Sequence, residues 1–295
     1  MDREEFVERT ERIPVQFPPQ HQPFHPGLEY LMEPRPVSET PYDRPSGKLE
    51  GKVAIISGGD SGIGRATAYA FAKEGASIVI VYLNEHVDAQ ETKERVEQIG
   101  KPCLAIAGDL GEEGTSVSVV NQTIDLFGKV DIIVNNCAES YPKERITEIT
   151  AEQLQRVFRS NVYSYFYLTK AALPYLQSGS SIINTTSGVA YDGQRGNLDY
   201  STTKGANATF TRSLALDLVD EGIRVNGVAP GPIWTPIIPS SFPREQMMTF
   251  GYGTPMKRAG QPYELAPAYV YLASDDSTYV TGQMIHVNGG AIMGS

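Results

Sequence analysis

The sequence is poor in cysteine, in positive charge and in long hydrophobic runs, and each shortage excludes a class of protein. Its two cysteines, Cys103 and Cys137, are too few for a disulfide framework and suit a reducing compartment. The net charge of −10 opposes the phosphate backbone, so we expect no nucleic-acid partner. The longest uninterrupted apolar stretch, 78–83, is far shorter than the roughly 20 residues of a membrane-spanning helix, so we expect no membrane partner.

Two further shortages concern metals and targeting. Two cysteines and four scattered histidines do not supply the ligands of a tetrahedral zinc site, so no metal is expected. The first residues, 1–5, are charged and no apolar segment follows them, which is not typical of a secretory signal. The chain is long enough to bury a sizeable core. We therefore predict a globular cytoplasmic protein.

Residues 1–47 differ in composition from the rest of the chain. They contain nine of the 20 prolines. Proline removes a backbone donor and restricts the residue before it, so we expect an extended arm without a helix or strand of its own. A disordered leader is the plain alternative. Because Phe17, Tyr30 and Met32 can dock in surface grooves, we favour an arm that packs along its own domain or on a neighbouring subunit.

Residues 48–295 alternate short apolar runs with amphipathic stretches, which predicts a single α/β domain. The candidate strands are the runs 53–57, 77–82, 102–107, 130–135, 180–185, 223–228 and 283–287. Helical periodicity lies between them, near 63–74, 87–99, 113–127, 151–177, 201–220 and 262–273. The runs are apolar on both faces, which is typical of a parallel sheet covered by helices on each side. We predict a doubly wound, Rossmann-like sheet of seven strands, with functional loops at 188–199 and 231–261.

A glycine-rich turn follows the first predicted strand. Gly58 lets the chain turn sharply, Gly62 leaves room for a pyrophosphate, and Gly64 lets helix and strand pack closely. The N-terminus of the next helix offers free N–H groups and a positive dipole end. A tight structural turn is the alternative, but the strand before it and the helix after it favour a dinucleotide site.

Tyr200 and Lys204 are four residues apart in a predicted helix, so their side chains share one face. Taken alone, the pair is explained as readily by a lysine that lies beside a half-buried tyrosine. Two more polar residues change that balance. Ser187 follows the fifth predicted strand, and Asn161 lies inside the predicted helix 151–177.

Together these motifs resemble the short-chain dehydrogenase/reductase family, from about residue 48 to the C-terminus. The family has three residues between the first glycine of its turn and the Gly-x-Gly that follows, as here. In the family, residues that match Asn161, Ser187, Tyr200 and Lys204 form the catalytic tetrad. The resemblance also implies a set of cofactor contacts at the glycine turn, the strand ends and the loop after the sixth strand. This set consists of Gly58, Asp60, Ser61, Gly62, Ile63, Gly64, Tyr82, Asp109, Leu110, Asn135, Cys137, Ala138, Tyr200, Lys204, Pro230, Gly231, Ile233 and Thr235.

The resemblance implies an NAD(P)-dependent oxidoreductase that transfers a hydride between NAD or NADP and a small or medium aldehyde, ketone or alcohol. We expect Tyr200 to donate a proton in reduction and to accept one in oxidation. A lysine cation about 5 Å away should lower the tyrosine pKa by about two units. Lys204 would also bind the nicotinamide ribose, Ser187 would hold the substrate oxygen, and Asn161 would organise a water.

The choice between NAD and NADP stays open. Tyr82 stands where NAD-preferring relatives usually have Asp, and Ser61 stands where many NADP-preferring relatives have Arg or Lys. Cys137 and Ala138 replace the family's usual Ala-Gly, so we expect an adjusted loop there.

The substrate pocket is expected at 139–141, at 189–197 and at 233–252, the last of which is apolar and rich in aromatic residues. The resemblance further implies a homotetramer formed through the helices 151–177 and 201–220. Two other hypotheses stay open. One is a non-catalytic dinucleotide-binding sensor or regulatory subunit, and the other is a scaffolding role for the arm.

Overall fold

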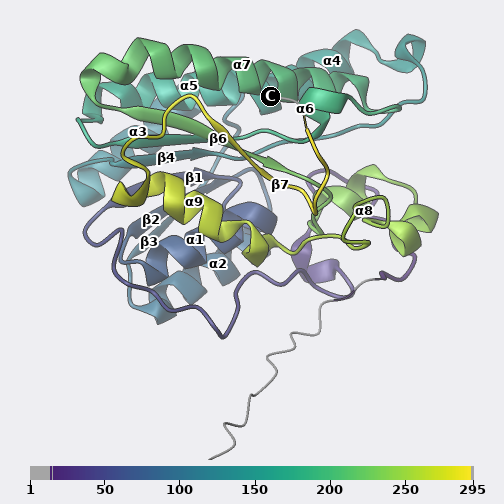
Figure 1. The fold of residues 1–295 in the computed structure, drawn as a ribbon, viewed down its shortest axis with the longest axis horizontal. Helices are drawn as coiled ribbons and strands as arrows, with labels where there is room; N and C mark the ends of the chain where they lie inside the picture. The colour runs from purple at the N-terminus through teal and green to yellow at the C-terminus, as the bar shows by residue number, and fades with distance from the viewer. Residues whose placement is uncertain (1–13, 15, 294–295) are drawn as a thin grey trace, which may run out of the picture.

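A seven-stranded parallel sheet forms the centre of the molecule in the computed structural model, which describes residues 14 and 16–293 (Figure 1). The strands are β1 (Val53–Ser57), β2 (Ser77–Tyr82), β3 (Cys103–Ala107), β4 (Ile132–Asn135), β5 (Ser181–Thr185), β6 (Arg224–Pro230) and β7 (Met284–Val287). Their order is β3-β2-β1-β4-β5-β6-β7, so the direction of winding reverses between β1 and β4. The predicted doubly wound fold is confirmed, and ligands of such sheets bind at this reversal point.

Helices cover both faces of the sheet, as Figure 1 shows. One layer contains α1 (Gly62–Lys73), α2 (His86–Ile99) and α9 (Ala266–Ala273). The other contains α3 (Glu113–Phe127), α4 (Ala151–Phe158), α5 (Ser164–Ala172) and α7 (Leu198–Leu218). A separate apolar cluster on each face joins strands to helices, which explains why the strands are apolar on both sides. In the part of the chain that the structure describes, no helix is long and apolar enough to span a membrane.

The predicted helix 151–177 is divided in the structure. A π-helical turn, Arg159–Tyr163, separates α4 from α5, and a 3-10 turn, Leu173–Tyr175, ends the segment. Asn161 lies in the π-helical turn. Such turns inside α-helices are frequent at functional sites, because the extra residue redirects one side chain. The two predicted loops also contain short helices, α6 (Val189–Asp192) and α8 (Ile237–Ser241).

The described part of the arm lies along the domain (Figure 1). The Phe17 ring stacks on Trp234, with ring centroids 3.8 Å apart and planes 10° apart. The indole Nε1 of Trp234 donates a 2.8 Å hydrogen bond to the Pro34 carbonyl oxygen. Within residues 14 and 16–47 of the arm, the expectation of no helix is wrong for one 3-10 turn, Glu29–Leu31. The division into an arm (1–47) and a domain (48–295) stays a prediction, since residues 1–13 and 15 lie outside the described part.

Candidate active site

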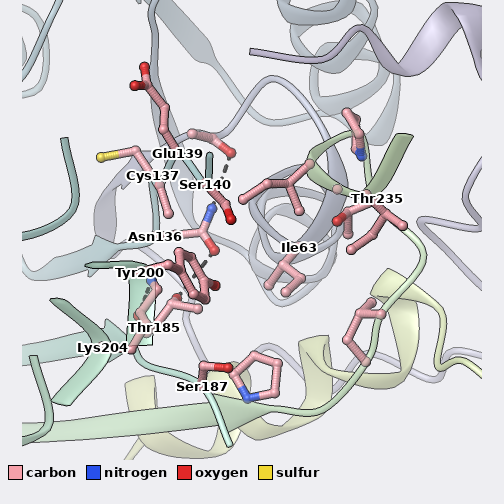
Figure 2. Close-up of a pocket in the computed structure, with 18 of the residues that line it drawn as sticks. Ile63, Asn136, Cys137, Glu139, Ser140, Thr185, Ser187, Tyr200, Lys204 and Thr235 are labelled. Atoms are coloured by element: carbon pink, nitrogen blue, oxygen red, sulfur yellow. Dashed lines mark hydrogen bonds between the residues drawn. The ribbon is translucent and has the colours of Figure 1, made fainter. Parts of the chain in front are cut away.

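A cavity of about 580 Å³ lies at the carboxyl ends of the strands, where the strand order reverses. Its walls come from the glycine turn after β1, from the segments after β2 to β6, and from the loop that carries α8. Figure 2 shows Tyr200, Lys204 and Thr185 together on one side, and Ile63 and Thr235 on the other. The fold therefore brings the two main motifs of the sequence to one cavity.

The glycine turn needs glycine for steric reasons at three positions. Gly58 and Gly62 have φ angles of +63° and +51°, which residues with a side chain rarely adopt. A Cβ on Gly64 would lie only 1.9 Å from the carbonyl oxygen of Gly58, so helix and turn approach as closely as expected. A Cβ on Gly62 would lie 3.0 Å from a methyl carbon of Thr235. This turn thus brings the N-terminus of α1 to the cavity, and the glycines themselves place no side chain there.

All of the predicted cofactor contacts except Gly64 and Asn135 are among the described residues that line the cavity. Gly64 lies behind the turn, in contact with Gly58. The Asn135 amide is buried and donates hydrogen bonds to Asn184 Oδ1 (2.9 Å) and Thr169 Oγ1 (3.1 Å). Asn136 lines the cavity instead, although the sequence motif contains both asparagines. Strand alternation explains this, because neighbouring side chains point to opposite sides.

The proposed catalytic pair lies in a buried environment. The Lys204 Nζ donates a 3.0 Å hydrogen bond to the Thr185 carbonyl oxygen and lies 5.5 Å from the centre of the Tyr200 ring. Burial lowers the pKa of Lys204 to about 8. Burial also raises the pKa of Tyr200 to about 12, and the Ser187 side chain only partly opposes this. The direction is opposite to the expected lowering of the tyrosine pKa, because desolvation by burial is the largest influence on this phenol.

Asn161 forms hydrogen bonds with the backbone of a loop that lines the cavity. Its Oδ1 accepts a 2.8 Å hydrogen bond from the backbone N–H of Glu139, and its Nδ2 donates to the Glu139 carbonyl oxygen at 2.9 Å. Asn161 itself is fully buried and is not among the described lining residues. It therefore fixes the backbone that follows β4. Its expected role with a water stays a prediction.

The substrate end of the cavity differs in part from the expectation. Glu139, Ser140 and several residues of 189–197 and 233–252 line it as predicted. Tyr141 does not; it lies behind Glu139 and donates its hydroxyl to that carboxylate at 3.0 Å. Trp234 is fully buried beneath the arm, so it contributes to the core and not to the lid.

Sequence reasoning missed three lining residues from the arm, His25, Pro26 and Gly27. No local signal connects this proline-rich segment to a cavity that is formed by residues more than 30 positions later. The apolar residues of the arm predict that it docks on the domain, but they do not indicate the cavity.

Two buried carboxyl groups line the cavity close to the ends of β1 and β2. Burial raises the pKa of Glu85 to about 7 and that of Asp60 to about 6, and both residues line the cavity. Glu85 accepts hydrogen bonds from the backbone N–H groups of Asn84 (2.7 Å) and Leu83 (3.1 Å). The basic residue nearest to the glycine turn, Arg65, is engaged elsewhere, because its guanidinium lies 2.7 Å from the Glu29 carboxylate. This geometry leaves the choice between NAD and NADP open.

Known proteins are similar to this one over nearly the whole chain. The model of a family described as enoyl-(acyl carrier protein) reductase matches residues 58–291. A Bacillus subtilis protein named "Uncharacterized oxidoreductase YhxC" is 61% identical, over 94% of this chain and 96% of the relative. The glucose and ribitol dehydrogenase of Daucus carota is 51% identical, over 94% and 98%.

Solved structures agree with these similarities. A short-chain dehydrogenase from Burkholderia cenocepacia J2315, solved in complex with NADP, matches with a TM-score of 0.77 at 27% identity. The match covers 82% of this chain and 98% of that structure. The range matched by the family model begins at the glycine turn and includes the Tyr200 helix, and the solved structure shares the fold.

Proposed function

The chain belongs to the short-chain dehydrogenase/reductase family, and on this premise we propose that it transfers a hydride between NAD or NADP and a carbonyl or alcohol, with Tyr200 as acid and base. The oxidoreductase class follows from the family. One observation carries the finer assignment. Ser187, Tyr200 and Lys204 line the same cavity as the glycine turn at the N-terminus of α1 (Figure 2).

The cavity suits a nicotinamide dinucleotide. It extends from Tyr82 and Leu110 after β2 and β3, past the glycine turn, to Tyr200 and Lys204. The helix that begins at Gly62 is 12 residues long, so its dipole favours a phosphate anion near its N-terminus, where the Gly62 N–H itself is bound by the Glu29 carboxylate. Among the described residues the Lys204 ammonium has one hydrogen-bond acceptor, the Thr185 carbonyl oxygen, which leaves N–H groups for ribose hydroxyls. When bound, the dinucleotide supplies or takes up the hydride.

Tyr200 supplies the proton that carbonyl reduction requires. Its raised pKa, about 12, keeps the phenol protonated at neutral pH and thus ready to act as an acid. The Ser187 hydroxyl, on the same wall, holds the substrate oxygen toward this phenol. In the oxidation direction Tyr200 must become a phenolate, which the Lys204 cation stabilises in this poorly solvated place. Asn161 keeps the backbone at Glu139 in position beside them.

We propose a small polyhydroxylated aldehyde, ketone or alcohol as the substrate. The relative from carrot is named for glucose and ribitol. The substrate end of the cavity offers polar groups that suit several hydroxyls, among them Glu139, Ser140 and Asn197. The Ser140 hydroxyl lies 3.0 Å from Asn197 Oδ1, so these groups form one polar wall.

We also propose a homotetramer, located in the cytoplasm, that associates through the outer faces of α5 and α7. Phe166 on α5 is 50% exposed and Leu216 on α7 is 78% exposed. The Phe166 ring lies 4.3 Å from that of Phe210, which joins the two helices into one apolar surface. Exposed apolar surfaces of this kind are typical of subunit contacts.

The substitution Tyr200→Phe tests the mechanism because it keeps the ring and removes the transferable proton. We expect kcat to fall at least about 100-fold, while the Kd for dinucleotide changes by less than about 2-fold. Turnover is measured from nicotinamide absorbance with NADH and NADPH in parallel, and binding from nicotinamide fluorescence. Tyr279→Phe, at a fully exposed tyrosine, is the matched control.

Two outcomes would contradict the proposal. A Tyr200→Phe variant with the parent rate would show that another group moves the proton. A parent protein that binds dinucleotide but converts no aldehyde, ketone or polyol would favour the non-catalytic sensor.

A further inference from the structure

The arm forms one wall of the cavity at its substrate end. His25, Pro26 and Gly27 line the same cavity as Ser187 and Tyr200. Gly27 lies directly against the start of α8, where a Cβ would come within 2.3 Å of the Pro236 carbonyl oxygen. The backbone of the arm therefore contacts the backbone of the loop that closes the substrate end of the cavity. The substrate site includes a segment that precedes the first strand of the domain.

Hydrogen bonds fix this segment on both sides. The Gln22 side chain closes the loop 22–28, because its Nε2 donates to the Leu28 carbonyl oxygen at 2.8 Å and its Oε1 accepts from the Leu28 N–H at 2.6 Å. The Gln22 backbone N–H donates to the Pro239 carbonyl oxygen at 2.8 Å. On the other side, the Glu29 carboxylate accepts from the Gly62 N–H at 2.6 Å. His25 is thus held within a loop that is tied to both α8 and α1.

The imidazole of His25 is available to a ligand. Its ring lies 4.3 Å from the ring of Tyr141, which orients it, and the residue is half-buried in the cavity wall. No described residue forms a hydrogen bond with the His25 side chain. Burial lowers the pKa of His25, although Glu139 opposes this, and the lowering favours the neutral ring. A neutral imidazole has one donor and one acceptor, which matches a hydroxyl group.

A fixed carboxylate lies on the same side of the cavity. Glu139 is held by the Arg156 Nε at 2.8 Å and by the Tyr141 hydroxyl at 3.0 Å. These two contacts fix the position of the Glu139 carboxylate. The wall therefore combines a carboxylate acceptor with the imidazole of His25, and together they favour a ligand with several hydroxyl groups.

We propose that His25 is a specificity-determining residue, which hydrogen-bonds a substrate hydroxyl other than the one that reacts. The ligand class is a polyhydroxylated alcohol or aldehyde, with Glu139 as the neighbouring polar contact. This inference rests on the proposed function, since a hydroxyl contact matters for catalysis only if the cavity binds such a substrate. It assigns part of the substrate specificity to the N-terminal arm.

The test compares ribitol with 1-pentanol, which has the same carbon chain and one hydroxyl. In His25→Leu we expect the ratio of kcat/KM for ribitol to that for 1-pentanol to fall at least about 10-fold, mainly through KM for ribitol. His25→Gln, which restores a donor and an acceptor, should recover part of the ratio. Phe24→Ala, at an exposed neighbour in the arm, should keep the ratio within about 2-fold. Isothermal titration of ribitol into the protein with NAD gives the same comparison without turnover.

The outcomes separate this inference from the proposed function. An unchanged ratio and unchanged ribitol affinity in His25→Leu would overturn the inference alone. Equal losses with both alcohols would also overturn it, because His25 would then only shape the cavity. A parent protein that binds no ribitol overturns it as well. Loss of the proposed function would show instead as a parent that binds ribitol in a His25-dependent way but transfers no hydride.

Discussion

Lys204 places an ammonium group in the interior of the protein. Its side chain is 1% exposed, and its Nζ donates a 3.0 Å hydrogen bond to the Thr185 carbonyl oxygen. Among the described residues no carboxylate pairs with it, so the desolvation of the charge is not offset by an ion pair. The proposed chemistry requires a cation at this position, so the folded state includes the unfavourable free energy of desolvating the ammonium group.

We expect Lys204→Met to stabilise the fold at pH 7 while it abolishes turnover. The pKa of Lys204 is about 8 in the folded protein, against 10.5 for the free side chain. Below pH 8 the lysine is charged in both states, and the difference destabilises the folded state by about 3 kcal/mol. Above pH 8 the folded state binds fewer protons than the unfolded state, so the parent recovers this stability as pH rises toward 10.5.

The measurement is the difference in free energy of unfolding between variant and parent, from urea denaturation at pH 7 and at pH 10. This difference should shrink as pH rises. Lys170→Met, at a lysine whose side chain is 77% exposed, is the control and should unfold at close to the parent's urea concentration at both pH values. A difference for Lys204→Met that is the same at pH 7 and pH 10 would mean that the lysine stays protonated in the folded state over this range, so that its pKa is not lowered.

At this scale the sequence predicts which residues meet better than it predicts their charge states. The spacing of Tyr200 and Lys204 on one helix places them together. The direction of the tyrosine pKa could not be predicted, because burial depends on how residues from other elements enclose the hydroxyl. Asn135 and Asn136 show the same limit, since one faces the core and the other the cavity.

At the scale of elements, strands are predicted more closely than helices. Each strand begins and ends within two residues of its predicted bounds, since both of its faces are apolar and short turns flank it. The predicted helix 151–177 contains the π-helical turn Arg159–Tyr163. An added residue in one turn leaves the apolar periodicity largely intact, so the sequence does not reveal it. That turn nevertheless places Asn161 against the backbone of Glu139.

The arm depends on Phe17 for its docking, and we expect Phe17→Ala to release it. Phe17 is 2% exposed and stacks on Trp234 within a cluster that also contains Met32 and Met247. Loss of a buried aromatic ring costs about 3 kcal/mol, which corresponds to about a 100-fold larger population of undocked arm. Limited proteolysis should then cleave the arm about 100-fold faster.

Leu31→Ala provides the control for this prediction. Leu31 is in the same arm but 52% exposed, so the variant should be cleaved at close to the parent rate. Equal cleavage of Phe17→Ala and the parent would show that other contacts, such as the Trp234 hydrogen bond to Pro34, suffice to dock the arm.

At the scale of the whole molecule, the cavity joins parts of the chain that are far apart in sequence. Phe17 of the arm stacks on Trp234 in the loop after β6, and Glu29 contacts Arg65 and Gly62 in α1. The sequence predicts that an arm with apolar residues docks, but the partners of each residue follow only from the folded domain. Contacts of this range have no local periodicity that reveals them.

The outer faces of α5 and α7 form the subunit contact of the proposed tetramer, and a substitution there tests it. We expect Phe166→Arg to convert the proposed tetramer into smaller species, because a charge placed in an apolar subunit contact must be desolvated without a partner. Val87→Arg is the matched control, since Val87 is 51% exposed on α2, in the layer on the opposite face of the sheet. Light scattering after size-exclusion chromatography measures the mass of each. A monomeric parent would refute the tetramer itself, whereas a Phe166→Arg protein with the mass of the parent would place the contact on another face.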